Sequence, residues 1–194
     1  MNSKKDVRNG LKNRAVKPGY ALRCLAALFL IGSIGACAAT VLPPEWGFQR
    51  EAIELNLISD QQLNDKNGTP HTLFVCVYQL RNPVSFDRLA TDPVGLYKLL
   101  ECEMFDPSVG TSNRLFVHPG QNQHAVFDRA EGARHVAVVA GYYTIEKERI
   151  VRVFDIPVDV EVSGFLSRKK QEKPRHIKIE MTLGPKQILA AKGK

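Results

Sequence analysis

Residues 71–80 read HTLFVCVYQL, and this stretch is apolar on both faces of an extended chain. The odd positions from 73 to 77 carry Leu, Val and Val, and the even positions from 74 to 80 carry Phe, Cys, Tyr and Leu. Because successive side chains of a strand point to opposite faces, a strand with this pattern has to be covered on both sides. Branched and aromatic residues also favour strands. We therefore predict a central, buried β-strand here.

The segments around this stretch predict a mostly β domain. Alternating or continuous apolar patterns indicate further strands at residues 53–57, 135–143, 150–158 and 175–183, and shorter ones at 114–117 and 124–127. Residues 86–89 and 94–103 space their apolar side chains at three and four, and Asp92-Pro93 is a helix-start signal. We expect a mostly antiparallel β-sandwich with one or two short inserted helices.

The first 36 residues have the composition of a signal peptide. A segment with seven Lys and Arg residues precedes an apolar run and a group of small residues that ends at Cys37. The run is shorter than the about 20 apolar residues that a transmembrane helix needs. Ile34-Gly35-Ala36-Cys37 resembles the bacterial lipobox, which implies cleavage before Cys37 and acylation of its thiol. An uncleaved anchor and a buried helix are the alternatives.

The acyl chains implied at Cys37 would hold the protein on a membrane without a transmembrane helix. Ala38 stands where an aspartate would favour inner-membrane retention, so the resemblance to the lipobox implies the outer membrane, with the protein on its periplasmic face. We expect residues 37–50, which contain Pro43-Pro44, to be a tether. The β-sandwich domain is then expected at residues 51–184.

The charge of the chain is concentrated at its two ends. The sequence has 27 Lys and Arg residues against 20 Asp and Glu, but without residues 1–36 the balance is 20 against 19, so the high pI does not indicate a nucleic-acid partner. From Arg168 to the end there are nine basic and two acidic residues. We expect residues 185–194 to be a basic tail that contacts anionic lipid or an acidic partner, or else a solvated, frayed terminus.

No pattern typical of a catalytic or metal site occurs. The five histidines form no HExxH pair and lie near no CxxC, and no GxSxG, Walker A or GxGxxG motif is present, so we predict no metal, no cofactor and no enzymatic activity. Cys76 and Cys102 could form a disulfide in an oxidising compartment. Because Cys76 alternates with other core positions, two buried free thiols are the preferred interpretation.

Residues 59–70, SDQQLNDKNGTP, form a connection that is long for a hairpin loop. Asn67-Gly68 supplies a turn that tolerates positive φ. Loops of this length in compact domains are either functional or disordered, and the residues alone favour neither.

Several of these features occur in an order that resembles the TssJ (SciN/VasD-like) lipoproteins of bacterial type VI secretion systems. The resemblance rests on an acylated cysteine followed by LNDKNGTP at 63–70, VYQL at 77–80 with Phe86 downstream, PGQ at 119–121 and VAVVAGYY at 136–143. It implies a transthyretin-like β-sandwich without catalysis of its own.

The resemblance also implies a partner. A TssJ lipoprotein binds the periplasmic C-terminal part of the inner-membrane protein TssM and so anchors the complex that TssJ forms with TssL and TssM. The loop at residues 59–70 would make this contact, with Leu63 as its apolar residue and with Asn64, Asp65, Lys66 and Asn67 beside it. The alternative is another outer-membrane β-sandwich lipoprotein, one that binds a periplasmic ligand or an envelope polymer.

Overall fold

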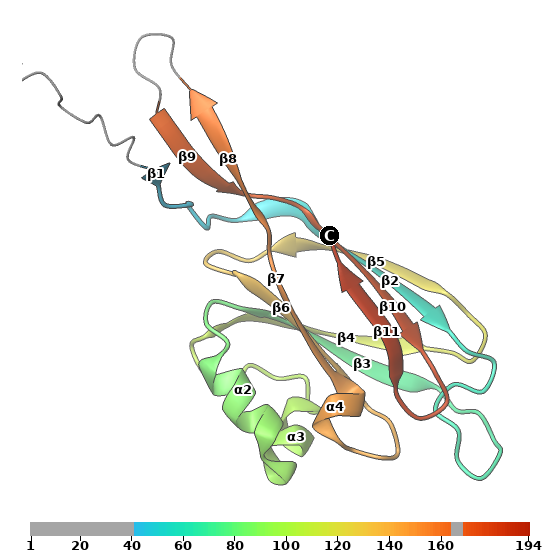
Figure 1. The fold of residues 1–194 in the computed structure, drawn as a ribbon. Coiled ribbons are helices and arrows are strands. Elements are labelled where there is room, and N and C mark those ends of the chain that lie inside the picture. The colour runs from blue at the N-terminus through green and yellow to red at the C-terminus, as the bar shows by residue number, and fades with distance from the viewer. Residues whose placement is uncertain (1–40, 164–168) are drawn as a thin grey trace, which may run out of the picture. The chain divides into compact units, whose positions relative to one another are not determined.

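The computed structural model describes residues 41–163 and 169–194. The expected signal peptide and the lipidation site at Cys37 lie outside the described residues. The body contains two four-stranded sheets (Figure 1). One sheet has the order β11 (Ile188–Gly193), β10 (Ile177–Leu183), β2 (Gln49–Ser59) and β5 (Gln123–Arg129). The other has the order β4 (Val109–Val117), β3 (Leu73–Leu80), β6 (His135–Ala140) and β7 (Val151–Asp155).

This architecture confirms the prediction of a mostly β fold. Neighbouring strands in the two sheets are antiparallel, except that β2 and β10 run parallel, with Ile53 opposite Ile177. This pairing joins two segments that are far apart in the sequence, so no local sequence pattern predicts it. The inward residues of β2, which are Ile53, Leu55 and Leu57, are at most 1% exposed, as the alternation in that segment predicts.

The two-sided pattern of β3 is explained by what covers each of its faces. Leu73, Val75 and Val77 are buried in the shared core. On the other face, the Tyr78 hydroxyl donates a hydrogen bond to the Leu99 carbonyl over 2.6 Å, beneath a layer of short helices. Burial raises the pKa of Tyr78 to about 12. The central strand was therefore predicted correctly, and its second face packs under helices.

Those helices are α2 (Val84–Thr91) and α3 (Pro93–Leu99), close to the ranges expected. Asp92 caps α3, because its carboxylate accepts a hydrogen bond from the Gly95 amide over 2.7 Å, and Pro93 occupies the first turn, where it costs no hydrogen bond. Phe86 and Leu99 are fully buried. The helix-start signal in the sequence thus acts as predicted.

Cys76 and Cys102 are joined by a disulfide, with their Cα atoms 5.3 Å apart. The preferred interpretation of two free thiols was wrong. The apolar surroundings of Cys76 are those of a core residue, but the segment after α3 returns across the face of β3 and brings Cys102 within bonding distance. The bridge ties the helical layer to the central strand.

A buried glutamine links the two sheets. Gln79 is 1% exposed, and its side chain donates to the Asp128 carbonyl over 2.8 Å and accepts from the Ala130 amide over 2.7 Å. Both amide functions are therefore paired, which removes the cost of burying them. The bonds run from β3 to the end of β5 in the facing sheet.

Both ends of the expected sandwich domain require correction. Residues 185–194 are not a tail, because they form the β10–β11 turn and strand β11, and Ile188 is 2% exposed. On the other side, part of the expected tether packs on the body. The Trp46 ring lies 5.6 Å from the Arg129 guanidinium and 5.8 Å from that of Arg134, and the Trp46 carbonyl accepts from the Gly132 amide.

A third, small sheet was not predicted. It consists of β1 (Val41–Leu42), β9 (Lys169–Pro174) and β8 (Val158–Ser163), in that order. The strand expected at 150–158 is divided, since β7 ends at Asp155 and β8 begins at Val158, after Pro157. A further short helix, α4 (Lys147–Ile150), precedes β7. Among the described residues, none of the helices is both long and apolar enough to cross a membrane.

Candidate functional site

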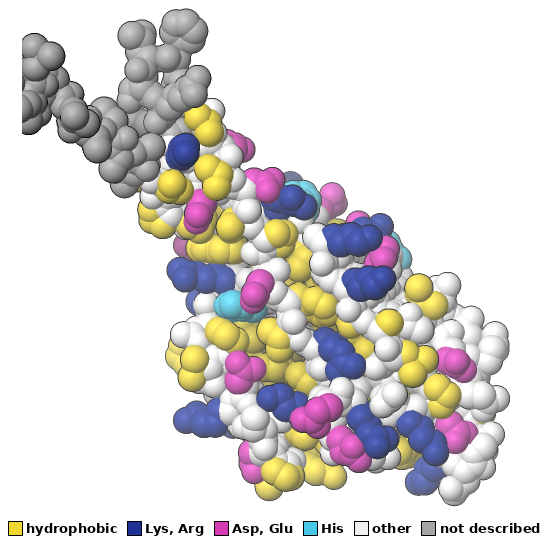
Figure 2. Space-filling view, in the orientation of Figure 1, with side chains coloured by type: hydrophobic (Ala, Val, Ile, Leu, Met, Phe, Trp, Pro, Cys, Tyr) yellow, Lys and Arg dark blue, Asp and Glu magenta, His cyan; other side chains and the backbone are white. Residues whose placement is uncertain are grey.

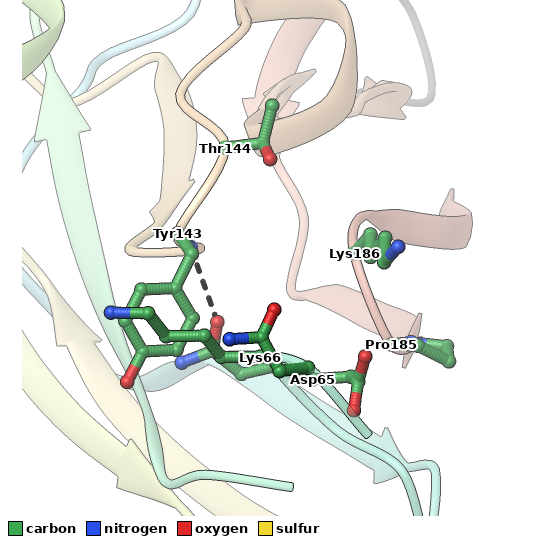
Figure 3. Close-up of a pocket in the computed structure, with 8 residues that line it drawn as sticks. Asp65, Lys66, Tyr143, Thr144, Pro185 and Lys186 are labelled. Atoms are coloured by element: carbon green, nitrogen blue, oxygen red, sulfur yellow. Dashed lines mark hydrogen bonds between the residues drawn. The ribbon is translucent and has the colours of Figure 1, made fainter. Parts of the chain in front are cut away.

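Three connections meet at one end of the sandwich and enclose a shallow depression of about 200 Å³. They are the β2–β3 loop, the segment that follows β6, and the β10–β11 turn. Figure 3 shows their side chains around the depression. The labelled residues are Asp65, Lys66, Tyr143, Thr144, Pro185 and Lys186.

The β2–β3 loop is ordered by its own hydrogen bonds and by those to its neighbours. The Asp60 amide donates to the Leu183 carbonyl over 2.9 Å, and the Asp65 amide donates to the Pro185 carbonyl over 2.7 Å. Within the loop, the His71 amide donates to the Leu63 carbonyl over 2.9 Å. These bonds fix the backbone along the loop, so the structure does not support the alternative of a disordered loop.

Leu63 is not a surface contact. Its side chain is fully buried and belongs to the hydrophobic core. The expectation that Leu63 offers an apolar contact to a partner is therefore corrected. As the single apolar residue between β2 and the buried start of β3, it holds the loop down on the sandwich, and its burial leaves polar residues at the surface.

Asn64 is also structural in this conformation. It is 5% exposed, with a positive φ of 51°. Its amide nitrogen donates to the Thr72 carbonyl over 3.2 Å, and its carbonyl oxygen accepts from the Tyr143 backbone amide over 3.2 Å (Figure 3). Asn64 thus joins the loop to the segment after β6, and it is too deeply buried to make much contact with a partner.

The next residues form the exposed tip. Lys66 and Thr69 exchange backbone hydrogen bonds of 2.9 and 3.1 Å around Asn67 and Gly68, whose φ angles are 55° and 82°. Two successive positive φ angles define the tight hairpin turn that Asn-Gly favours, as the sequence predicted. Lys66 and Asn67 are exposed at this turn.

Tyr143 is the aromatic residue of the site, and its place there was not predicted from the sequence. The residue is 51% exposed, the Lys66 ammonium lies 4.7 Å from the centre of its ring, and the His71 ring packs edge-on with its centre 5.3 Å away. Figure 3 shows the Lys66 side chain extending across the ring. Gly141, two residues earlier, lies against the Phe74 ring, where a Cβ atom would collide. The sequence Gly-Tyr-Tyr was the feature that could have pointed to this residue. Of its two tyrosines, Tyr142 is buried and Tyr143 is exposed.

Asp65 is the acidic residue of the site and lines the depression together with Lys66 and Lys186. One of its carboxylate oxygens is buried and has no hydrogen-bond partner among the described residues. Lys186, from the β10–β11 turn, lines the same depression. The described part of the chain holds no group of three His, Cys, Asp or Glu residues placed to bind a metal ion. The site therefore offers mixed charge, amides and one aromatic ring, which are features of a recognition surface.

The sequence matches one family over residues 51–184, the family described as type VI secretion lipoproteins (VasD, EvfM, TssJ). The protein belongs to this family of secretion-system lipoproteins. The match ends at Gly184, so the β10–β11 turn and β11 lie beyond it. No protein with curated annotation is significantly similar to the sequence.

Solved structures share the fold at low sequence identity. The type VI secretion lipoprotein TssJ1 from Pseudomonas aeruginosa aligns with a TM-score of 0.55 and 17% identity, over 78% of this chain and 98% of its own. Serratia marcescens Lip, a membrane-bound component of the type VI secretion system, aligns with a TM-score of 0.51 and 18% sequence identity. The alignment covers 75% of this chain and 98% of Lip. A chain in the structure described as the TssM C-terminal domain (869-1107) from EAEC aligns with a TM-score of 0.50 and 15% sequence identity. The alignment covers 70% of this chain and 94% of the other.

Proposed function

We propose that this protein is an outer-membrane lipoprotein, acylated at Cys37, that anchors the type VI secretion membrane complex by binding the periplasmic C-terminal region of TssM. The observation that carries the proposal is the family match over residues 51–184. The similar fold in a structure described as the TssM C-terminal domain supports the choice of partner. TssL would belong to the same complex, and the lipoprotein would act by binding, without catalysis.

The TssM-binding surface is assigned to the depression at the end of the sandwich. Asp65, Lys66 and Asn67 would form its rim, together with Tyr143 and Lys186. A half-exposed tyrosine beside a cation is a common anchor of protein interfaces. The depression, at about 200 Å³, is smaller than the about 300–1,000 Å³ of pockets that enclose small ligands. A protein partner fits this surface better than a small periplasmic ligand does.

The membrane anchor would make a modest interface sufficient. Acyl chains at Cys37 confine the protein to the periplasmic face of the outer membrane, where the reach of the tether keeps it near its partner. Such confinement raises the effective concentration and lowers the entropy lost on binding. A small, polar surface can then hold the complex together.

Matched substitutions test the surface without disturbing the core. Lys66→Glu and Tyr143→Ala change exposed side chains of the site, and Lys98→Glu and Tyr97→Ala change exposed side chains of the same types on α3. We expect each site variant to weaken binding of the TssM periplasmic domain about tenfold or more, and each α3 variant to bind like the wild type. Titration of the mature Cys37→Ser protein by calorimetry measures this. Wild-type affinity in both site variants would place the interface elsewhere.

The anchor is tested in cells. Cys37→Ser removes the acylated thiol, so the protein should leave the outer-membrane fraction and appear as a soluble periplasmic protein or remain at the inner membrane. Membrane fractionation with immunodetection measures the shift. Unchanged outer-membrane fractionation of the variant would refute acylation at Cys37.

A further inference from the structure

The β8–β9 hairpin has an apolar face that the rest of the described chain leaves uncovered. Val158, Val160 and Val162 alternate along β8 with polar residues and so share one face. Their side chains are 40%, 53% and 56% exposed, respectively. Figure 2 shows hydrophobic side chains at the surface of this part of the molecule. A strand that alternates in this way is typical of a sheet with one face packed on another layer.

The opposite face of the hairpin carries exposed ion pairs and is suited to contact with water. The Glu161 carboxylate lies 2.6 Å from the Lys173 ammonium across the two strands, and Asp159 lies 3.3 Å from the Arg175 guanidinium. These ion pairs are exposed. The hairpin therefore has a polar face suited to solvent and a valine face suited to an apolar environment.

The position of this face in the chain identifies that environment. β1 runs parallel to β9, with Val41 opposite Lys170, so the chain enters this sheet from the end at which β9 begins. Cys37 precedes Val41 by only four residues, which span at most about 14 Å when fully extended. If Cys37 carries acyl chains, the end of the hairpin beside Val41 lies within about 14 Å of the anchored cysteine.

The lysine at one end of the valine face also fits a phospholipid surface. Lys170 is exposed and lies opposite Val162 in the β8–β9 register, next to Val41, which is 42% exposed. A lysine at the margin of an apolar patch can bury its stem and place its ammonium among phosphate groups. Glu172, half-buried opposite Val160, is the acidic residue of this face.

We propose that the valine face of the β8–β9 hairpin is a membrane-contact surface, which rests in the interfacial region of the bilayer that holds the acylated Cys37. The bound partner is the phospholipid surface, with the valines among the upper acyl segments and Lys170 at the phosphates. This inference rests on the proposed acylation of Cys37. It adds a second contact to the lipid anchor, and two contacts fix the orientation of the sandwich where one would leave it free to rotate.

The test places an environment-sensitive fluorophore at Val160. In the acylated protein the thiol of Cys37 is blocked and Cys76 is bonded to Cys102, so Val160→Cys introduces a free thiol for labelling with a nitrobenzoxadiazole probe. Val126→Cys is the matched control, because Val126 is 45% exposed on β5 of the main sandwich. Both proteins are reconstituted in vesicles of phosphatidylethanolamine and phosphatidylglycerol.

We expect the probe at residue 160 to shift its emission to shorter wavelength on reconstitution and to be quenched by nitroxide-labelled lipid at least threefold more than the probe at residue 126. Equal emission and equal quenching at the two positions would overturn the proposal. A probe at residue 160 that responds only when the TssM periplasmic domain is added would also overturn it, in favour of a protein partner.

A second arm separates this proposal from the acylation on which it rests. The mature Cys37→Ser protein carries an N-terminal histidine tag and is held on vesicles that contain a nickel-chelating lipid. The hairpin is then near the bilayer whether or not the native protein is acylated. We expect the same blue shift and quenching at residue 160, and their absence here would refute the hairpin contact itself. Mass spectrometry of the native protein, by contrast, tests the acyl chains alone.

Discussion

The β2–β3 loop and the β8–β9 hairpin both project from the sandwich, and they treat their apolar residues in opposite ways. The loop buries its one apolar residue, Leu63, completely and presents Asp65, Lys66 and Asn67 at its surface. The hairpin pairs Glu161 with Lys173 on one face and leaves valines such as Val160 exposed on the other. The loop therefore has a polar surface above a buried apolar residue, whereas the hairpin has an apolar surface that no described residue covers.

This difference fits the contact that is proposed for each segment. A polar surface with a fixed backbone suits a specific protein partner, because its hydrogen-bonding groups are already positioned. An uncovered stripe of valines suits an environment that selects by polarity and not by shape, as a bilayer does. Under the two proposals, the loop would serve recognition and the hairpin attachment, so substitutions in each should have different consequences.

The largest expected effect is at the base of the loop. Leu63→Ala should lower the free energy of unfolding by about 2–5 kcal/mol, because it opens a cavity in the core. Leu189→Ala is the matched control at a side chain that is 51% exposed, and it should change the free energy by about 0.5 kcal/mol or less. Urea unfolding of the mature protein followed by circular dichroism measures both. Equal losses would mean that Leu63 is not buried, and the comparison would fail.

The next effect concerns the body that carries both segments. Replacing Cys76 and Cys102 together by Ser should cost about 3 kcal/mol of stability, because the bridge closes a loop with a sequence separation of 26. Affinity for TssM at the loop and lipid contact at the hairpin should both persist below the lower melting temperature. Two free thiols in the unreduced, denatured wild type would contradict the bridge.

A smaller effect separates structural from exposed residues within the loop. Asn64 and Asn67 have nearly the same positive φ, 51° and 55°, so Ala at either position incurs a similar backbone strain. Asn64→Ala also loses two hydrogen bonds in a buried setting and should be less stable than Asn67→Ala by about 1–3 kcal/mol. Thermal unfolding of the two variants gives the difference directly. No difference would mean that the side-chain bonds of Asn64 contribute nothing.

The smallest expected effect is at the hairpin. Replacing Val160 by Thr keeps the shape and the β-propensity of the side chain, so the stability of the soluble protein should change by no more than about 0.5 kcal/mol. Val75→Thr, at a fully buried position on β3, should cost several times more because it buries a hydroxyl group. Comparable losses at Val160 and Val75 would show that the valine face is covered in solution.

Local patterns in the sequence predicted the parts of the fold that local physics determines. The double apolar pattern of residues 73–80 identified the central strand, Asp92-Pro93 located the start of α3, and Asn67-Gly68 predicted the turn at the loop tip. In each case the responsible interaction lies within a few residues of the signal, or concerns burial alone.

The remaining features depend on segments far apart in the chain. Strand β10 pairs in parallel with β2, and β11 then adds to β10, so a terminus rich in lysine joins the sheet because of its neighbours and not because of its own composition. The charge of residues 169–174 hid a strand whose partner is β8. Tyr143 is exposed beside the loop, and Gly141 packs against the Phe74 ring, but one sequence reveals neither arrangement.

The bridge between Cys76 and Cys102 also bears on how such a protein would reach its destination. The cytosol keeps thiols reduced, whereas the periplasm oxidises them. A newly made chain would therefore lack the disulfide, and its folded state would be less stable while the chain still had to cross a membrane in extended form. The disulfide would form only after transport, so the domain would reach its full stability only in the oxidising compartment.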